Sequence, residues 1–398
     1  MKILFLTRLF PNDYNSRSGK VMFQQAKELK RLGHEVVVVS PTPFTPIVIR
    51  RFREEWKVYS QLPNKELYNG ILVFRPRFID LPIKALKRHS WKSINRFIGR
   101  LIERVYKDFK FDIIHAHMGY PDGRVGLELK KKFNVPLITT IRSTDTVKNL
   151  KLYKVKEELT KALINSDVVI SPSVPIKRTI EEKLRISPKI IGNGTYLTNK
   201  VTTNQYLKDK FKDKIVLLSV ANLIERKAID YNIKAVKRII KKIPDFVYII
   251  IGDGPQRGYL EELVNKLKLN KHVFFKGNLP NEKAMEYMSI CDIFSLPSWK
   301  ETFGLVYIEA MLNQKPIILS RDEAIEGTVI HKYNGMVVEP KNVEQLVDSI
   351  KFLCTNVEAA KKISINGEKT VLKHYLWSHI GEELERVYMN LLDKNKSG

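Results

Sequence analysis

A regular alternation of short apolar runs with longer helical patterns constrains the fold of this chain more than any other feature. Helical spacing fills the intervals between the runs, as in Val21–Leu32 and Ser93–Tyr106. Such alternation is typical of parallel strands with helices on both faces of the sheet. The first half of the chain is therefore predicted to be a doubly wound α/β domain. Its predicted strands are Ile3–Thr7, Glu35–Ser40, Ile71–Phe74, Asp112–Ala116, Pro136–Ile141 and Asp167–Ser171.

The second half repeats this rhythm after a polar stretch from Tyr196 to Lys214, which is predicted to be an interdomain linker. We therefore expect an α/β protein with two domains, 1–200 and 201–376, followed by a helical segment, 377–398. Ligands of doubly wound sheets bind at the carboxyl ends of the strands, so the cleft between two such domains is the expected site. The predicted strands of the second half are Ile215–Val220, Phe246–Ile251, Val273–Phe275, Ile293–Leu296 and Pro316–Leu319.

The segment from Ser298 to Met311 carries two carboxylates, Glu301 and Glu309, eight positions apart on either side of Gly304. An apolar run precedes it and helical spacing follows, so Gly304 marks the expected start of a helix. A helix N-terminus offers unpaired N–H groups and a partial positive charge to a phosphate. On one continuous helix the two carboxylates would point about 80° apart, whereas a loop lets Glu301 fold back toward a ligand. One carboxylate could then bind sugar hydroxyls and the other a ribose. Two solvated surface acids are the alternative interpretation.

This segment resembles the Glu-x7-Glu motif of retaining nucleotide-sugar glycosyltransferases, in particular glycosyltransferase family 4 with its GT-B fold. Other motifs of that family follow in order along the chain. They are Gly252-Asp253-Gly254-Pro255, the strand end at 273–277, Pro297-Ser298 and Glu309-Ala310-Met311. The resemblance covers nearly the whole chain and is densest from about residue 215 to 340. It implies two Rossmann-like domains facing each other across a cleft, with the last helix crossing back to the first domain.

The resemblance also implies a division of labour between the domains. The first domain would bind the acceptor, and the second would bind the nucleoside diphosphate sugar. Glu309 would hold the ribose, and Glu301 would contact the sugar hydroxyls at the catalytic centre. The other donor-binding positions that the motifs imply are Gly252, Gly254, Gly277, Phe303, Gly304 and Leu305.

A cation for the donor diphosphate is expected at Lys227, in a sequence similar to the family pattern Gly-Arg-Leu-x3-Lys-Gly. Asn222 replaces the Arg of that pattern, and Ala228 replaces its last Gly. Asn222 stays a candidate donor-binding residue, because an amide can donate a hydrogen bond, although it brings no charge. Without a metal, fixed cations and a helix N-terminus must stabilise the leaving diphosphate. A solvated lysine at the start of a helix is the alternative interpretation of Lys227.

The first domain contributes further candidates. His117 resembles the family's cleft histidine, whose implied role is contact with the donor sugar at the reaction centre. Strand alternation puts His115 on the same side of the strand, where a packed structural role is expected. Asp145 resembles the Asp of the family's His-Gly-x-Asp loop, in which Arg142 stands in place of the His. Both are expected on the acceptor side of the cleft. Gly19 opens the first long helix, where the family has two glycines that let the backbone approach a ligand; a plain loop is the alternative.

The formal net charge is +26, and such a field attracts polyanions. Basic residues cluster at Arg50, Arg51 and Arg53 and along a helix predicted within 84–106. That helix also carries an apolar stripe, formed by Trp91, Ile94, Phe97, Ile98, Leu101 and Val105. A sheet-covering helix with a solvated basic face and a membrane-surface patch are both open interpretations. For the first domain as a whole we expect an anionic membrane surface as partner. No nucleic-acid motif occurs, so nucleic acid is not expected.

The combined expectation is a retaining hexosyl- or N-acetylhexosaminyltransferase, with a UDP-sugar favoured as donor and a glycan or lipid-linked acceptor. It would be cytoplasmic and peripheral on the inner membrane face, because no apolar run approaches the roughly 18 residues of a spanning helix. No metal or other cofactor is expected, since no His/Cys cluster has metal-ligand spacing. The alternatives are a nucleotide-sugar epimerase of the same fold and a non-catalytic protein that binds nucleotide sugars or polyanions.

Overall fold

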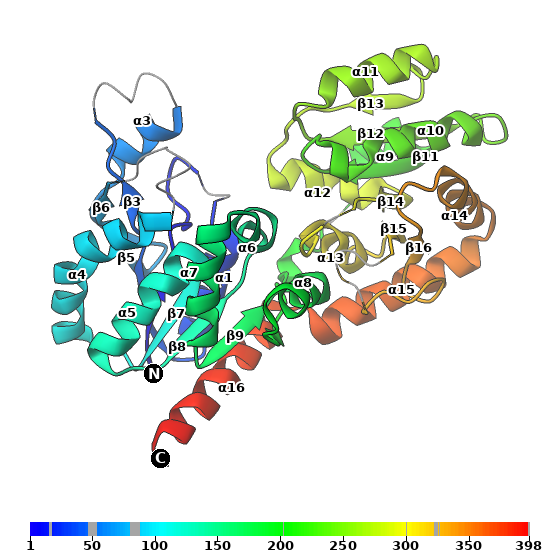
Figure 1. Ribbon diagram of the computed structural model, residues 1–398. Coiled ribbons are helices and arrows are strands. Elements are labelled where there is room, and N and C mark those ends of the chain that lie inside the picture. The colour runs from blue at the N-terminus through cyan, green and yellow to red at the C-terminus, as the bar shows by residue number, and fades with distance from the viewer. Residues whose placement is uncertain are drawn as a thin grey trace. The chain divides into compact units, whose positions relative to one another are not determined.

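The computed structural model describes residues 1–15, 18–46, 54–79, 88–201, 203–299, 301–321, 325 and 327–396 (Figure 1). The chain forms two compact units. The first comprises Met1–Gly192 together with Trp377–Gly398, and the second comprises Asn193–Leu376. Each unit is built on a parallel sheet with helices packed on it, so the predicted α/β class with two doubly wound domains is confirmed.

The sheet of the first unit has the strand order β10-β9-β8-β7-β1-β2-β5-β4. Its neighbouring strands are parallel, apart from the antiparallel pair of β4 and β5. Each run that the sequence predicted in this half overlaps one strand of this sheet. The strands are β1 (Lys2–Leu6), β2 (Glu35–Val39), β4 (Lys65–Tyr68), β5 (Ile71–Phe74), β7 (Ile113–His117), β8 (Leu137–Thr140), β9 (Val168–Ser171) and β10 (Lys189–Ile190). A separate small sheet pairs β3 (Thr42–Pro43) with β6 (Arg77–Phe78).

Helices of the first unit pack on the sheet through apolar faces. In α4 (Ser90–Phe109), Ile94, Ile98, Ile102 and Val105 recur at helical spacing, and all four are buried. The other helices described in this unit are α1 (Lys20–Arg31), α3 (Glu54–Gln61), η2 (Gly119–Gly123), α5 (Arg124–Phe133), α6 (Ser143–Val147), η3 (Asn149–Lys151), α7 (Tyr153–Ile164), α8 (Val174–Leu184) and α16 (Trp377–Lys396).

The last helix, α16, completes the first unit and packs against α1. Gly381 permits close contact, because a Cβ at this position would lie 2.9 Å from Cβ of Glu28. Nε2 of His34 lies 2.8 Å from Oε1 of Glu385. The end of the chain is therefore an integral part of the unit that contains its beginning.

The second unit has a parallel sheet in the order β13-β12-β11-β14-β15-β16. Its strands are β11 (Ile215–Val220), β12 (Phe246–Ile251), β13 (Val273–Phe275), β14 (Ile293–Leu296), β15 (Ile317–Ser320) and β16 (Met336–Val338). The described helices are η4 (Leu197–Asn199), α9 (Gln205–Lys210), η5 (Glu225–Lys227), α10 (Ile229–Ile239), α11 (Arg257–Lys266), α12 (Asn281–Ile290), α13 (Leu305–Leu312), α14 (Val343–Thr355) and α15 (Val357–His374). Each run predicted for this half overlaps one strand of this sheet.

The polar stretch from Tyr196 to Lys214 belongs to the second unit, so its prediction as a linker was wrong. The side chain of Asn204 accepts a hydrogen bond from the N–H of Leu207 and so caps α9. Its Nδ2 donates to Glu286 in α12 over 2.9 Å. The polar residues that indicated a linker instead serve a helix cap and contacts with the body of the unit.

Candidate functional site

Glycines bring the loops that follow β11 and β12 close together in the second unit. Gly252 and Gly254 have φ values of 132° and 159°, which L-residues with a side chain rarely adopt. A Cβ at Gly252 would lie 1.8 Å from the carbonyl oxygen of Ala221, and one at Gly254 would lie 2.5 Å from that of Leu223. The Gly-x-Gly pair is thus required by close backbone packing. Gly277 joins the same group of loops, because its carbonyl accepts a hydrogen bond from the N–H of Gly252 over 2.8 Å.

Lys227 and Glu301, predicted separately from two motifs, form an ion pair in which Nζ of Lys227 donates to Oε2 of Glu301. Their side chains are only 14% and 8% exposed. The backbone supports this pair, because the N–H of Trp299 donates to the carbonyl of Arg226 over 2.9 Å. The loop after β14 is thereby fixed against η5. A cation and a carboxylate therefore meet at the carboxyl edge of the sheet, beside the start of α13.

The start of α13 has the backbone geometry that the sequence predicted. Gly304 is the N-cap residue and has left-handed dihedral angles, φ 77° and ψ 58°. Phe303 is buried, and its ring lies 5.8 Å from that of Tyr375, while Leu305 packs against the same core. The side chains of these two predicted donor-binding residues are therefore occupied by the core, and the backbone is what they can offer a ligand. Glu309 lies within α13 and is half-buried.

The two departures from the family pattern near Lys227 differ in their structural effect. Asn222 is exposed, and its carbonyl accepts a hydrogen bond from the N–H of Ile224 over 2.9 Å. Ala228 adopts the left-handed conformation, φ 55° and ψ 32°, at the position where the family has Gly. The local backbone geometry that favours glycine therefore persists without the glycine.

In the first unit, His117 ends β7 and is completely buried. Its ring lies 4.1 Å from the ring of His115, on the same side of the strand as predicted. A guanidinium nitrogen of Arg142 lies 3.2 Å from Nδ1 of His117 and 3.3 Å from Oε1 of Gln25. Burial, together with His115 and Arg142, holds the pKa of His117 well below its usual value. Burial also lowers the pKa of Arg142 to about 10.

His115 has the packed structural role that was expected. Its Nδ1 lies 2.6 Å from the hydroxyl of Tyr388 in α16, and its Nε2 lies 2.7 Å from Oγ1 of Thr140 in β8. Burial, and secondarily Arg142, lower the pKa of His115 to about 3. The ring is therefore neutral and forms part of the support for His117.

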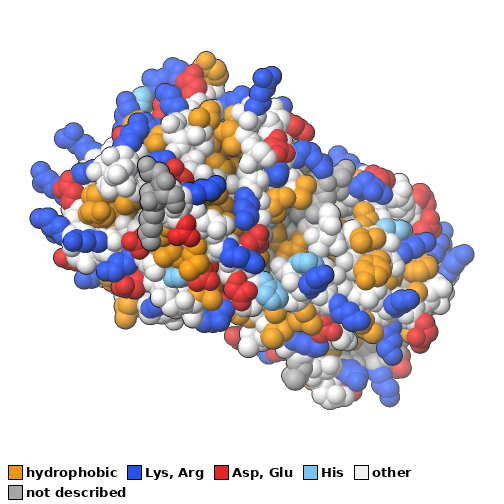
Figure 2. Space-filling view, turned by 90° about the horizontal axis from the view of Figure 1, so that it is seen from below, with side chains coloured by type: hydrophobic (Ala, Val, Ile, Leu, Met, Phe, Trp, Pro, Cys, Tyr) orange, Lys and Arg blue, Asp and Glu red, His pale blue; other side chains and the backbone are white. Residues whose placement is uncertain are grey.

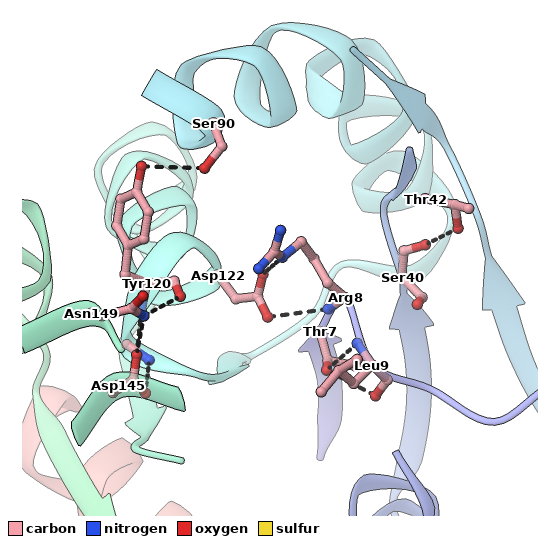
Figure 3. Close-up of polar contacts among 11 residues, drawn as sticks. Thr7, Arg8, Leu9, Ser40, Thr42, Ser90, Tyr120, Asp122, Asp145 and Asn149 are labelled. Carbon is pink, nitrogen blue, oxygen red and sulfur yellow. Dashed lines mark hydrogen bonds and ion pairs between the residues drawn. The ribbon is translucent and has the colours of Figure 1, made fainter. Parts of the chain in front are cut away.

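Asp145 is also buried, and its carboxylate is occupied by the protein itself (Figure 3). Oδ2 accepts hydrogen bonds from the N–H groups of Gly119 and Arg142 over 2.8 and 3.0 Å. Oδ1 accepts from the N–H of Tyr120 over 3.1 Å and from Nδ2 of Asn149 over 3.0 Å. Asp145 thus links the loop after His117 to the start of α6 through hydrogen bonds, and these bonds hold the loop in place.

Gly19 is the N-cap residue of α1 and has a φ of 75°. A Cβ at this position would lie 2.3 Å from the carbonyl oxygen of Leu9. Gly19 thus lets the start of α1 approach the loop that follows β1.

The sequence did not predict one pair of residues at the carboxyl edge of the first unit's sheet, Arg8 and Asp122. Oδ2 of Asp122 accepts from the N–H of Arg8 over 3.1 Å, and Oδ1 lies 3.6 Å from Nε of Arg8 (Figure 3). Burial raises the pKa of Asp122 to about 7, although Arg8 acts in the opposite direction. The two residues follow the neighbouring strands β1 and β7. The sequence shows that each residue follows a predicted strand, but only the strand order of the sheet shows that the two residues lie close together.

Within the described ranges, no group of three or more His, Cys, Asp or Glu side chains could hold a metal ion. Among the helices of the same ranges, none combines the length and apolar character needed to cross a membrane.

Comparisons with known proteins identify the family. Residues 203–370 match the model described as "Glycosyl transferases group 1", and residues 18–198 match "Glycosyltransferase Family 4". An uncharacterized glycosyltransferase of Methanocaldococcus jannaschii is 31% identical over 71% of this chain and 76% of its own length. The alpha-monoglucosyldiacylglycerol synthase of Acholeplasma laidlawii is 28% identical over 92% of each chain.

Solved structures of other proteins superpose on nearly the full length of this chain. Sucrose-phosphate synthase from Thermosynechococcus elongatus superposes with a TM-score of 0.77 at 21% identity, covering 99% of this chain and 100% of that chain. Anabaena HepE in complex with UDP gives a TM-score of 0.72 at 18% identity, covering 98% and 100%. The chain belongs to glycosyltransferase family 4 and has the GT-B fold.

Proposed function

We propose that this glycosyltransferase is a retaining enzyme that moves a hexosyl or N-acetylhexosaminyl group from a nucleoside diphosphate donor to a glycan or lipid-linked acceptor. The observation that carries the proposal is the ion pair of Lys227 and Glu301 beside the start of α13. A nucleoside diphosphate sugar has its anionic diphosphate directly next to the sugar hydroxyls. A cation in contact with a carboxylate, next to the N–H groups at the start of a helix, matches these two adjoining parts of one ligand.

The proposed donor contacts follow from this match. Lys227 and the first N–H groups of α13 would bind the diphosphate, and Glu301 would accept hydrogen bonds from the sugar hydroxyls. Glu309 would hold the ribose. UDP is the favoured nucleotide, in keeping with the UDP complex of Anabaena HepE, which shares the fold.

In the proposed reaction, an acceptor hydroxyl oxygen bonds to the anomeric carbon on the face from which the diphosphate departs. The bond between that carbon and the diphosphate oxygen breaks, and the acceptor proton passes to a phosphate oxygen. Configuration is therefore retained. Negative charge grows on the leaving diphosphate, and the fixed charge of Lys227 would stabilise it most in the transition state. His117 would contact the sugar near the reaction centre, and the mechanism requires no metal or other cofactor.

The acceptor side of the proposal draws on two observations. The relative from Acholeplasma laidlawii is named as a synthase of a glucosylated diacylglycerol. The chain carries a net charge of +26, and Figure 2 shows Lys and Arg side chains distributed over the face in view. We therefore propose polysaccharide or glycolipid synthesis on the inner face of a membrane by a cytoplasmic, peripherally bound enzyme.

The described part of the first unit offers one surface suited to this docking, which we call the α4 surface. It consists of the exposed basic residues Lys92, Arg96 and Arg100 and the exposed apolar residues Phe44, Ile79 and Phe97. The N–H of Phe44 donates to the carbonyl of Phe78 over 2.7 Å, and Oγ of Ser93 donates to the carbonyl of Ile79 over 2.7 Å. These bonds bring the loops after β3 and β6 to the start of α4. The cluster of Arg50, Arg51 and Arg53 lies outside the described residues.

The proposal is tested by transfer from an α-linked UDP-sugar, with other nucleoside diphosphate sugars in parallel, to a diacylglycerol or glycolipid acceptor in the presence of EDTA. Proton NMR of the fresh product should reveal an α linkage and activity that survives the chelator. An inverted anomer, or activity abolished by EDTA and restored by a divalent cation, would contradict the proposed mechanism. An epimerised nucleotide sugar formed without acceptor would identify the epimerase alternative.

The variants Glu301→Gln and Glu309→Gln test the donor contacts in the same assay. Glu301→Gln should slow transfer about 10- to 100-fold, the effect of losing a charged hydrogen bond, while sparing the affinity for free UDP. Glu309→Gln should weaken the binding of free UDP by a similar factor. Isothermal titration calorimetry with UDP separates the two, and equal effects of both substitutions on UDP affinity would refute this division.

A further inference from the structure

The contact between Arg142 and His117 determines where the imidazole carries its proton. An arginine guanidinium has N–H donors and no acceptor. Nδ1 of His117 lies 3.2 Å from a terminal nitrogen of Arg142, so Nδ1 must accept this hydrogen bond and cannot carry a proton. A neutral imidazole whose Nδ1 accepts has its proton on Nε2. The geometry therefore selects one of the two tautomers.

The other ring nitrogen of His117 has no hydrogen-bond partner among the described residues, although it is buried. A buried N–H group that lacks a hydrogen-bond partner destabilises the folded protein. Native proteins rarely leave such a group unsatisfied, and each case requires an explanation. His117 lies at the end of the central strand β7, so an acceptor atom of a bound ligand would supply the missing partner.

The surroundings of His117 exclude a role as a proton acceptor. His115 is neutral, and both of its nitrogens are bound, by Tyr388 and Thr140. The ring of Phe5 lies 4.5 Å from that of His117, on the neighbouring strand β1. Arg142 brings a positive charge, and Gln25 binds the same guanidinium nitrogen. These groups disfavour an imidazolium at this position, so the ring stays neutral.

We propose that Arg142 is a positioning residue that fixes His117 in the Nε2–H tautomer, so that His117 donates a hydrogen bond to an oxygen of the bound sugar. That this oxygen belongs to a sugar rests on the proposed function, whereas the assignment of the tautomer does not. Arg142 occupies a position where the family pattern has His. The arrangement thus belongs to this chain and separates the donor role of His117 from any acid–base role.

The tautomer can be measured on the full-length protein without substrate. Long-range ¹⁵N–¹H NMR of histidine-labelled protein distinguishes the two neutral forms and the imidazolium, and His117→Gln identifies the signal among the eight histidines. We expect His117 to be neutral, with the proton on Nε2, at pH 6. A proton on Nδ1, or an imidazolium at this pH, would overturn the proposal.

Two substitutions test the role of Arg142. Arg142→Met removes the donor to Nδ1 and should allow a mixture of both tautomers. Arg142→Lys keeps a cationic donor and should restore the Nε2–H form. An unchanged His117 spectrum in the correctly folded Met variant would overturn the assignment to Arg142. If Arg142→Met fails to fold, the wild-type spectrum and the Lys variant still decide, since a mixture of tautomers in either would refute the proposal.

Catalysis supplies the second readout. Arg142→Met should lower kcat about 2- to 10-fold, the effect of one neutral hydrogen bond, and Arg142→Lys should recover most of it. Affinity for free UDP should not change, because the proposed UDP contacts come from the second unit. A Met variant that loses UDP affinity and kcat together would indicate general disruption and refute the positioning role. If wild-type protein transfers no sugar, the proposed function fails, while the NMR result still decides the tautomer.

Discussion

Asp122 and Asp145 in the first unit are both buried, yet their surroundings differ. Asp145 accepts four hydrogen bonds, from three backbone N–H groups and Asn149. Asp122 accepts one backbone N–H, from Arg8, whose Nε lies 3.6 Å away. Burial raises the pKa of both carboxyl groups, and hydrogen bonding opposes this shift more extensively at Asp145. Asp122 is therefore the carboxyl group that changes charge near neutral pH.

A pH dependence of stability follows from the raised pKa of Asp122. Unfolding returns this group from about 7 to its ordinary value of 3.8. Between these pH values the unfolded chain ionises Asp122 while the folded protein keeps the proton. The contribution of Asp122 to the free energy of unfolding is therefore complete below about pH 4. It is lost as pH rises toward 7, which lowers the free energy of unfolding by at most about 4 kcal/mol. Asp122→Asn removes this loss, so its free energy of unfolding relative to wild type should increase from pH 4 to 7 and then level off.

Urea unfolding at several pH values measures this difference. Asp108→Asn, at an exposed position near the end of α4, is the matched control and should follow the wild-type profile. A constant difference between Asp122→Asn and wild type across this range would show that Asp122 is ionised throughout.

A motif can mark a candidate residue from the sequence alone, whereas the contacts between distant residues depend on topology. Lys227 and Glu301 each lie in a recognisable pattern, although their contact depends on β11 pairing with β14. Arg8 and Asp122 lie 114 positions apart and meet because β1 pairs with β7. No local signal encodes that pairing. The contact of Arg142 with His117 was equally out of reach, since it requires the rotamers of both residues.

Among the elements, α4 illustrates how far periodicity determines burial. The predicted stripe included Trp91, Ile94 and Phe97, but Phe97 is 45% exposed. A residue three positions from a buried one lies about 60° away around the helix, at the margin of the stripe. Trp91 lies under the guanidinium of Arg124, whose carbon is 3.8 Å from the ring centroid, and packs against the core. The helix is therefore a sheet-covering element with one exposed aromatic residue.

This arrangement predicts opposite outcomes for two aromatic substitutions on α4. Trp91→Ala should lower the free energy of unfolding by about 2–4 kcal/mol, because it removes a packed ring and leaves a cavity. Phe97→Ala should change it by less than about 0.5 kcal/mol, as is usual at exposed positions. Chemical denaturation of both variants measures the difference. Equal destabilisation by the two substitutions would mean that Phe97 is packed in solution.

The central strands of both sheets were predicted, because burial on both faces demands a continuous apolar run. The edge strand β16 was missed although Met336 and Val338 are buried, because its apolar run is only three residues long. The edge strand β4, Lys-Glu-Leu-Tyr, was missed because it is largely exposed and polar. The polar stretch before β11 was misread for the related reason that α9 is short and mostly exposed. The polar composition of a segment indicates that it is exposed to solvent, and exposure alone does not distinguish a linker from a small surface helix.

For the molecule as a whole, charge is the property that composition reports most directly. The excess of 69 Lys and Arg over 43 Asp and Glu gives a field that acts on any anionic surface. Each Lys or Arg near an anionic membrane contributes about 1 kcal/mol, so a few acting together suffice for reversible binding. Attraction of this kind falls off within about 8 Å at physiological salt.

Flotation with lipid vesicles tests the docking of the α4 surface. Binding should require anionic lipid and weaken as salt rises. Replacing Lys92, Arg96 and Arg100 with Glu should release the protein, and Phe97→Ala should weaken binding. The same charge change at Lys241, Lys242 and Lys271, which are exposed in the second unit, is the matched control and should have a smaller effect. Equal loss from both triple variants would indicate attraction by net charge without a docking surface.

The course of the chain through the two units also bears on how the protein is made. The second unit, Asn193–Leu376, is inserted into the first, and its two ends lie side by side, since Thr195 donates its N–H to the carbonyl of Tyr375 over 2.8 Å. During synthesis all of the second unit emerges before α16 does. Tyr388, whose hydroxyl lies 2.6 Å from Nδ1 of His115, is thus translated after the whole of the second unit. Of the two units, the one whose translation begins earlier is therefore completed later, and the support of its candidate catalytic histidine forms only when α16 has left the ribosome.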